Sequence, residues 1–399
     1  MYLEETITTK VEDTYDVAVC GGGFAGISAA LASARQGKKT VLFERQFMLG
    51  GLGTSGIVTI YLPLCDGYGH QVSFGIAEEL LRLSISQGAE AMYPENWLDE
   101  KGTRSETDKR FQVRFNAQLF AILAEKLLLD AGVAILYGTY AVGVTVKDCK
   151  IQHIITENKS GRRAYRVTSV VDATGDCDIA KLADAPTKGF RQGNILAAWY
   201  YSIGKNGYNL NMIGASDIPD EEKTDENKVQ LLMDRRFSGL DGSEISEYMQ
   251  LSHQAAYHDF LKKREFDSDL LPVTIATIPQ LRMTRKICGE YELSDKEMHT
   301  YFEDSIGMVS NWRKRGPVYE VPFRTLYSST IRNLITAGRC TSVTETMWDI
   351  MRVIPCCAVT GQAAGTAAAI SDDFTALDVA KLQELLRAAG VVLHESDLN

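Results

Sequence analysis

The order of apolar and polar positions near the N-terminus predicts a β-α-β unit. An apolar run covers residues 16–20, a cluster of glycines follows, and alanine-rich helical spacing covers residues 24–36. A second apolar run, residues 40–43, ends at Glu44. A strand, a helix and a second strand in this order, over about 30 residues, predict two parallel strands joined by a crossover helix.

The next predicted elements change from a helical to a strand period. Apolar positions recur at helical spacing over residues 115–131, and Gly132 is a typical helix stop. Four short apolar runs follow, separated by Gly, Asp and Lys turns, which predicts a β-meander and a strand that returns to the main sheet. These runs are residues 133–137, 142–146, 151–157 and 164–171.

The middle of the chain, from about residue 183 to 327, predicts a mixed α+β module. Residues 243–263 have the pattern of a long amphipathic helix, and residues 270–278 have that of a strand. The stretch 219–228 is strongly charged and poor in apolar residues, so we expect a solvated outer loop that carries no chemistry.

The C-terminal part returns to the pattern of the first module. It predicts a strand at 333–337, a helix that opens near Thr360 and an amphipathic helix at 376–389. The fold class is therefore α/β, with an inserted α+β domain. We expect the first domain to comprise residues 1–60, 112–182 and 331–399, and the inserted domain residues 61–111 and 183–330.

Composition narrows the class of protein further. A chain of 399 residues is longer than one hydrophobic core normally serves, which favours two interleaved domains. No apolar stretch is long enough to span a bilayer, and residues 1–16 lack the features of a secretory signal, so we expect a cytoplasmic protein with no membrane partner. The net charge of -10 argues against a nucleic-acid partner.

The eight cysteines are scattered and predict free thiols. No C-x-x-C spacing occurs, which excludes a thioredoxin-type pair and a ferredoxin-type cluster, and we predict no metal site. Cys356 and Cys357 follow Pro355 at a predicted strand-to-helix transition. We expect them to pack as small apolar residues, with a vicinal redox disulfide as the alternative.

The glycine motif at residues 21–26 (GGGFAG) is the first chemical signal. Gly21 permits a tight turn, Gly23 lets backbone amides approach a pyrophosphate, and Gly26 lets the helix pack closely on the sheet. The positive end of the helix dipole then faces the phosphates, and Glu44 is placed to bind a ribose. Because strand, helix, second strand and acid occur in the required order, the motif predicts a bound dinucleotide.

Three further features favour FAD over NAD. Arg45 and a second glycine loop at residues 50–56 provide more backbone donors for a longer dinucleotide. Residues 170–176 end a strand in a small-residue turn, which lets the chain pass close to an adenosine. Residues 335–339 form another strand-to-turn, and residues 361–365 are predicted to begin a helix whose N-terminus faces the flavin's pyrimidine edge.

With these motifs the chain resembles the FAD-dependent oxidoreductases, whose two-domain fold is shared more distantly with fumarate reductase, thiazole-biosynthesis flavoproteins and the flavin subunit of heterodisulfide reductase. The resemblance is strongest over residues 15–56, 170–182, 282–291 and 334–369. It implies a Rossmann-like domain with non-covalent FAD held by Gly21, Gly23, Gly26, Glu44, Arg45, Gly51, Thr54, Ala173, Thr174, Gly338 and Arg339. We extend the predicted cofactor-binding set to Phe24, Ala25, Ser55, Val144, Gly175, Gly361 and Gln362.

The resemblance also places arginines at the seam between the domains. Arg282 and Arg285 lie in one such segment and Arg352 in another. A guanidinium there would either tune the flavin or hold a substrate carboxylate with two hydrogen bonds. A structural ion pair is the alternative for each. We predict substrate binding by Arg282 and Arg285, and a catalytic role for Arg352.

Candidate proton carriers are Cys65, His70, Tyr319 and Asp349. Cys65 and His70 follow the second glycine loop, so we predict that they face the flavin as catalytic residues, and that Tyr319 binds substrate. Relatives often carry a histidine in the segment after residues 338–339, whereas this chain reads TETMWD at residues 344–349. The acid or base of the family is therefore not assigned.

These features predict an oxidoreductase that transfers a hydride between a small polar organic substrate and flavin N5. Hydroxy acids, keto acids and sugar derivatives would fit the arginines. No second glycine motif follows a strand, so the electron partner is a second small molecule, oxygen, a quinone or another protein. The alternatives are an FAD-holding scaffold subunit, a flavin monooxygenase or halogenase, and a biosynthetic enzyme that only borrows the fold. Whether the chain forms homo-oligomers is left open.

Overall fold

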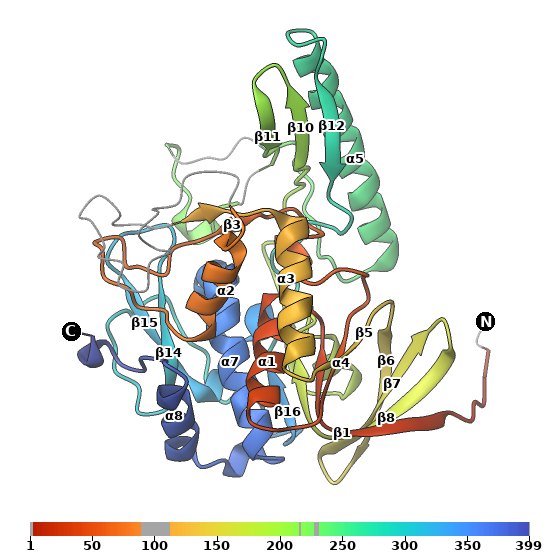
Figure 1. Cartoon of the computed structure of the whole chain (residues 1–399), viewed down its shortest axis with the longest axis vertical. Helices are drawn as coiled ribbons and strands as arrows, with labels where there is room; N and C mark the ends of the chain where they lie inside the picture. Colours follow the sequence, from red (N-terminus) through yellow and green to blue (C-terminus); the bar gives the residue numbers. More distant parts are fainter. Residues whose placement is uncertain (1–2, 89–111, 215–216, 227–230, 399) are drawn as a thin grey trace.

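The computed structural model describes residues 3–88, 112–214, 217–226 and 231–398 (Figure 1). Its centre is the predicted β-α-β unit, formed by β1 (Lys10–Cys20), α1 (Phe24–Arg35) and β2 (Thr40–Phe43). Strand β1 starts at Lys10, earlier than predicted. Its first half is largely exposed and polar, so hydrophobic patterning gives no signal there. Its second half, from Val17 to Cys20, is fully buried and pairs in parallel with β2.

The unit belongs to a seven-stranded sheet with the order β5-β2-β1-β8-β7-β6, in which β16 also pairs with β8. The pairs β1–β2, β1–β8, β2–β5 and β8–β16 are parallel. Strands β6, β7 and β8 form the predicted antiparallel meander with its returning strand. The bounds are β5 (Ala134–Leu136), β6 (Tyr140–Lys147), β7 (Lys150–Asn158), β8 (Gly161–Asp172) and β16 (Leu334–Thr336).

Four helices share a core with one face of this sheet, and they lie side by side in Figure 1. They are α1, α2 (Ile76–Ile85), α3 (Ala117–Asp130) and α7 (Ile354–Ile370). Contact between α1 and α7 depends on two glycines of α7. A Cβ atom on Gly361 would lie 2.3 Å from the carbonyl oxygen of Ala25, and one on Gly365 would lie 2.1 Å from that of Ala29. Only glycine allows the two backbones to come this close.

The start of α7 differs from the prediction. The helix begins at Ile354, with Val353 as its N-cap residue, and not near Thr360. Pro355 lies in the first turn, where its missing N–H costs no hydrogen bond, so it is a start signal. The predicted start at residues 361–365 is wrong because those glycines serve helix packing.

The remaining elements form a peripheral arm and two smaller layers. In the arm, α5 (Gly242–Arg264) covers a sheet of β10 (Tyr200–Gly204), β11 (Gly207–Asn211) and β12 (Leu271–Ile275), which projects at the top of Figure 1. The other elements are β3 (Ile60–Tyr61), β4 (Val113–Arg114), α4 (Asp178–Leu182), β9 (Thr187–Gly189), β13 (Arg285–Ile287), β14 (Ser305–Ser310), β15 (Val318–Pro322), α6 (Glu345–Met351) and α8 (Val379–Ala388).

The predicted α/β class is confirmed. The division into two domains stays a prediction, and part of its second segment, residues 89–111, lies outside the described residues. Helix α2, assigned to the inserted domain, packs in the same core as α1 and α7. In the described part of the chain no single helix is long and apolar enough to cross a membrane; α6 and α7 reach that length only together, across an 89° bend.

Candidate functional site

A cleft of about 350 Å³ opens at the carboxyl ends of four parallel strands. Cys20, Phe43, Ala173 and Ala337, which end or directly follow β1, β2, β8 and β16, all line it. In open α/β sheets this edge is where ligands bind. The predicted cofactor-binding residues that line it are Gly21, Gly23, Phe24, Ala25, Glu44, Arg45, Gly51, Ala173, Thr174, Gly175, Gly338 and Arg339.

The glycine turn before α1 has the geometry expected of an anion cradle. Gly21 adopts a φ of +100°, and its Cβ position would lie 2.4 Å from the carbonyl oxygen of Ala173. A Cβ on Gly26 would lie 1.8 Å from the carbonyl oxygen of Gly21, whereas the space beside Gly23 is open. Helix α1 has no side-chain cap and no acidic residue in its first turn. Its free amides therefore point to the cleft, where they would hold a pyrophosphate.

Glu44 is the acid at the end of β2, and it is held rigidly. The Glu44 carboxylate is buried and accepts hydrogen bonds from the backbone N–H groups of Gly22 at 2.6 Å and Gln46 at 2.7 Å. A carboxylate has about four acceptor positions, so two stay available for ribose hydroxyls.

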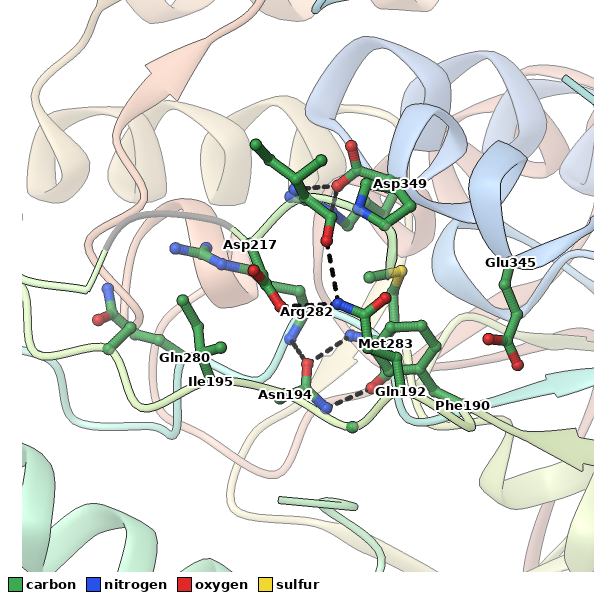
Figure 2. Close-up of a pocket in the computed structure, with 15 residues that line it drawn as sticks. Phe190, Gln192, Asn194, Ile195, Asp217, Gln280, Arg282, Met283, Glu345 and Asp349 are labelled. Carbon is green, nitrogen blue, oxygen red and sulfur yellow. Dashed lines mark hydrogen bonds and ion pairs between the residues drawn. The ribbon is translucent and has the colours of Figure 1, made fainter. Parts of the chain in front are cut away.

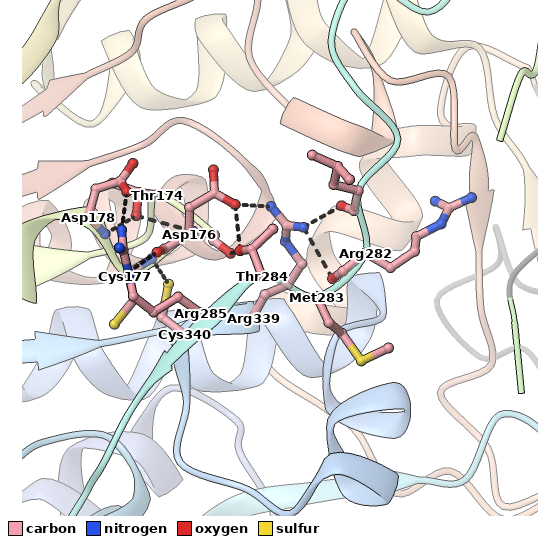
Figure 3. Close-up of polar contacts among 12 residues, drawn as sticks. Thr174, Asp176, Cys177, Asp178, Arg282, Met283, Thr284, Arg285, Arg339 and Cys340 are labelled. Carbon is pink, nitrogen blue, oxygen red and sulfur yellow. Dashed lines mark hydrogen bonds and ion pairs between the residues drawn. The ribbon is translucent and has the colours of Figure 1, made fainter. Parts of the chain in front are cut away.

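Arg339 forms the opposite wall of the cleft (Figure 3). Its guanidinium donates to the carbonyl oxygens of Leu281 and Arg282 and lies 3.5 Å from Asp176, with which it forms an ion pair. A Cβ on Gly175 would lie 2.3 Å from the Arg339 guanidinium, so glycine is required there. Arg45, which also lines the cleft, lies 3.7 Å from the same Asp176 carboxylate. Two cations thus flank Asp176 in the wall of the cleft.

Arg285 lies behind this wall. Its guanidinium donates to the carbonyl oxygen of Asp176 at 3.0 Å and to the carboxylate of Asp178 at 2.7 Å (Figure 3). It therefore orders the turn after β8, and it does not line the pocket where Arg282 lies.

A second helix N-terminus faces the cleft, but at different residues from those predicted. The first turn of α7 is uncapped, and Ile354 and Cys357 line the cleft. Gly361 and Gln362 do not, because they lie farther along the helix. The side-chain oxygen of Gln362 accepts a hydrogen bond from the backbone N–H of Ile76 at 2.8 Å, so this residue fixes α2.

Four other predicted cofactor residues also lie off the cleft wall. Gly26 packs against the glycine turn, and the Thr54 hydroxyl donates to the carbonyl oxygen of Leu49, which closes the second glycine loop. Ser55 is buried behind that loop, and its carbonyl oxygen accepts from the backbone N–H of Thr277. Val144 lies in the middle of β6, whereas residues 139–141 at the start of this strand line the cleft.

Sequence reasoning missed the wall formed by residues 277–279 and Leu281. The Gln280 side chain donates to the carbonyl oxygen of Gly56 at 2.7 Å, which fixes this segment against the second glycine loop. The segment follows β12 and carries no glycine motif. Only the tertiary contact brings it to the cleft. Gly50, Leu52 and Gly53 of the second loop line the cleft as well.

A second, much smaller cavity adjoins the cleft (Figure 2). Its volume is about 20 Å³, enough for a single water molecule. Arg352 lines both cavities and Arg282 lines the small one, so the two predicted seam arginines lie together. Asp217, Ile218 and Pro219 form part of its wall. The prediction that residues 219–228 form an outer loop without chemistry is therefore wrong for Pro219, and residues 227–228 lie outside the described residues.

Arg352 is held by a buried carboxylate. Its guanidinium donates to Asp349 at 2.6 and 3.0 Å, and Arg313 binds the other oxygen of the same carboxylate. Burial alone would raise the pKa of Asp349, but the two guanidinium groups outweigh it and hold this pKa below its usual value. Asp349 is therefore an ionised positioning group and a poor candidate for a proton carrier.

Arg282 differs from Arg352 because it has no carboxylate partner among the described residues. It is 8% exposed and lies over the ring of Trp199, 5.0 Å from its centre. Burial, with repulsion from Arg352, lowers the pKa of Arg282 to about 9. Figure 3 shows its side chain extending away from the Arg339–Asp176 pair.

The structure places the other predicted catalytic and substrate residues outside both cavities. Cys65 is buried in the main core, and the His70 ring is largely exposed, 2.8 Å from the Asp66 carboxylate. Tyr319 is buried in β15, where its hydroxyl donates to the carbonyl oxygen of Asp295 and burial raises its pKa. Cys65 and His70 therefore do not face the cleft, contrary to the prediction. None of the eight cysteines, all of which are described, forms a disulfide.

Partial matches link the chain to several flavoproteins and related enzymes. It is 27% identical to thiamine thiazole synthase of Methanothermobacter thermautotrophicus over 179 residues, which cover 42% of this chain and 59% of that protein. It is 29% identical to thioredoxin reductase of Ureaplasma parvum over 75 residues, which cover 19% of this chain and 24% of that protein. The matched region thus spans less than two thirds of either relative.

A solved structure of a geranylgeranyl bacteriochlorophyll reductase-like protein from Thermoplasma acidophilum is similar over 95% of this chain and 82% of its own, with 15% identity and a TM-score of 0.48. The family model described as FAD dependent oxidoreductase matches residues 16–197 and 192–386, nearly the whole chain. The cradle at α1, the acid at β2 and the two cations in the wall fit the cofactor of this family. The chain belongs to the FAD-dependent oxidoreductases, and it is an enzyme that binds FAD.

Proposed function

We propose that this enzyme transfers a hydride between a small polar organic substrate, bound beside Arg282 and Arg352, and the N5 atom of FAD. One observation carries the proposal: Arg352 lines both the cofactor cleft and the small pocket, so a substrate in the pocket would adjoin the cofactor. FAD supplies, when bound, a two-electron donor and acceptor.

The residues around Arg352 support this assignment because they fix its position before any ligand arrives. Asp349 accepts from its guanidinium and is itself fixed by Arg313, and the ring of Trp312 lies 5.5 Å from the guanidinium. A fixed guanidinium stabilises negative charge without reorganisation, either on the cofactor or on a substrate.

The test is an anaerobic screen of the FAD-loaded protein against a library of hydroxy acids, keto acids, other carboxylates and sugar acids. A substrate bleaches the flavin absorbance, or restores the absorbance of chemically reduced protein. The proposal fails if no small molecule does either. Bleaching by a protein partner alone would favour a scaffold subunit, and rapid consumption of oxygen by the reduced protein with an oxygenated product would favour a monooxygenase.

Arg352→Met should retain FAD but lower the rate of flavin reduction about tenfold or more, because the pocket loses a charge-assisted donor. Arg352→Lys should restore only part of the rate, since an ammonium group does not form the same fork. The control is Arg162→Met, which removes an arginine from the meander, where it pairs with Glu157. Equal rates for Arg352→Met and this control would remove Arg352 from the site.

A further inference from the structure

We propose that the small pocket is a receptor for a carboxylate attached to an apolar group, with Arg282 as the residue that binds the anion. This inference rests on the proposed function, because it names the class of substrate that would lie beside the cofactor. It narrows the earlier expectation of hydroxy acids or sugar derivatives.

The first argument is the missing counter-charge of Arg282. Burying a cation costs several kcal/mol unless an anion compensates it. Among the described residues the Trp199 ring is the close partner of its guanidinium, and Arg352 and Arg339 repel it. Asp349 attracts it from a distance, but that carboxylate is already bound by Arg352 and Arg313. The Arg282 guanidinium carries five N–H donors, two of which match a carboxylate. The missing partner is therefore a ligand with a carboxylate.

The second argument is that every acidic group in the pocket wall already has a cation. Asp217 pairs with Arg236, Glu345 with Arg191 at 2.9 Å, and Asp349 with Arg352 at 2.6 Å. An incoming carboxylate would therefore find one uncompensated cation. A cationic ligand would have to break an existing ion pair, so the pocket favours anions.

The third argument concerns the part of the ligand beyond the carboxylate. The amide side chains of the wall already form hydrogen bonds with other residues of the protein. Asn194 accepts from the backbone N–H groups of Arg282 and Met283 and donates to backbone carbonyls, as Figure 2 shows in part. Gln280 accepts from the backbone N–H of Trp199 and donates to Gly56, and Gln192 binds the backbone and side chain of residues 217–220.

A sugar or polyol would therefore lose water without gaining new partners in this pocket. The remaining lining side chains are apolar. They are Phe190, Ile195, Ala197, Ile218, Pro219 and Met283. Among them Ile195 is 6% exposed and lies outside the main hydrophobic clusters, so its side chain is available to contact a ligand. An alkyl or aryl body gains burial against such a wall.

Any ligand larger than water requires one wall of the pocket to move, because the volume is about 20 Å³. Residues 217–226, which we call the strap, are attached partly by surface contacts. The Glu221 carboxylate accepts from the Thr346 hydroxyl at 3.2 Å, and Glu222 pairs with Lys314 at 2.7 Å. At its inner end the strap is also held by Arg236, Arg313 and Gln192, which bind Asp217 and Ile218. We therefore expect it to open from its outer end, where the Glu222–Lys314 pair contributes little to stability.

The experiment measures binding by calorimetry and by perturbation of the flavin spectrum, on FAD-loaded full-length protein. The probes are phenylpropionate, its neutral amide phenylpropionamide, and lactate. Phenylpropionate should bind about tenfold or more tightly than the amide, the effect of one charge-assisted pair, and more tightly than lactate. Equal binding of acid and amide overturns the anion receptor, and tighter binding of lactate overturns the apolar body.

Variants assign the effect to residues. Arg282→Met should retain FAD and reduce the acid-to-amide preference to about one, whereas Arg282→Lys should keep part of it. Ile195→Thr, which keeps the branch at Cβ but replaces the ethyl group with a hydroxyl, should weaken acid and amide alike by about fivefold. A full preference in Arg282→Met overturns the proposal. Because binding needs no turnover, carboxylate binding together with a screen in which no compound reduces or reoxidises the flavin would contradict the proposed function alone.

Discussion

The cofactor cleft and the substrate pocket are neighbours but are built in opposite ways. The cleft is open, at about 350 Å³, and its critical surfaces are backbone: glycine turns and two uncapped helix starts. The pocket is much smaller, at about 20 Å³, and its surfaces are mainly side chains from separate segments. A backbone cradle exists before its ligand binds, whereas a side-chain pocket of this kind takes its shape partly from the ligand.

The largest effect should come from the glycine that holds the cradle together. In Gly26→Ala the new Cβ would lie 1.8 Å from the carbonyl oxygen of Gly21, and neither backbone segment can move without unpacking α1. We expect a loss of about 4 kcal/mol or more in the free energy of unfolding, and no FAD binding. Chemical denaturation followed by circular dichroism measures the first. A stable variant that binds FAD would show that the cleft is not preformed.

Gly23→Val should weaken FAD binding without changing the stability of the fold. The space beside Gly23 is open to the cleft and its backbone is in an ordinary extended conformation, so the side chain fills the cradle without strain. FAD affinity should fall about 100-fold, or about 3 kcal/mol, while the melting temperature of the FAD-free protein stays nearly unchanged. Fluorescence titration with FAD measures the affinity. Retained affinity would exclude Gly23 from the pyrophosphate site.

Arg282→Met tests, through the stability of the protein, whether the small pocket contains an uncompensated charge. Removing a buried cation without a carboxylate partner should raise the free energy of unfolding by about 2–3 kcal/mol at pH 7 in the absence of any added carboxylate. If the free energy of unfolding does not rise in Arg282→Met, the charge of Arg282 is already compensated in the folded protein.

The pH dependence sharpens this test. Because burial lowers the pKa of Arg282 to about 9 in the folded protein, the unfolded chain binds more protons than the folded chain above pH 9. The destabilisation caused by the buried charge is therefore complete well below pH 9 and falls as the pH rises. The advantage of Arg282→Met should therefore be constant from about pH 6 to 8 and shrink by about 1 kcal/mol at pH 10. Urea unfolding of both proteins at these pH values gives the comparison.

The smallest effect should come from the strap. Glu222→Gln removes the exposed ion pair with Lys314 and should raise the association rate of phenylpropionate about two- to threefold, with FAD affinity unchanged. Stopped-flow measurement of the flavin spectral change gives the rate. A matched change at Lys381→Gln, which breaks an exposed pair on α8, should leave the rate unaltered.

Sequence reasoning was accurate where neighbouring residues determine the structure. The central strands, α1 and the meander follow from local periodicity, and the glycines that reach the cleft follow from the tight turn at Gly21. The start of α7 was misplaced because the glycines at 361 and 365 were taken to mark the beginning of the helix, whereas they lie inside it and Pro355 is in the first turn. FAD and the family are confirmed, whereas the roles of individual residues stay predictions.

The small pocket was harder to predict from the sequence because its residues come together only in the folded chain. Nothing local distinguishes Arg282, which has no carboxylate partner, from Arg285, which pairs with Asp178. The strap and the wall at 277–281 likewise carry no pattern that links them to a pocket. His70 was chosen from its position after a glycine loop, but that loop turns its following segment away from the cleft.

The two helix starts that face the cleft are far apart along the polypeptide, α1 near residue 24 and α7 at residue 354. A ribosome therefore releases one wall of the cleft long before the other exists. The complete cleft must wait for the synthesis of α7, and a chain interrupted before α7 would emerge without one of its two helix starts.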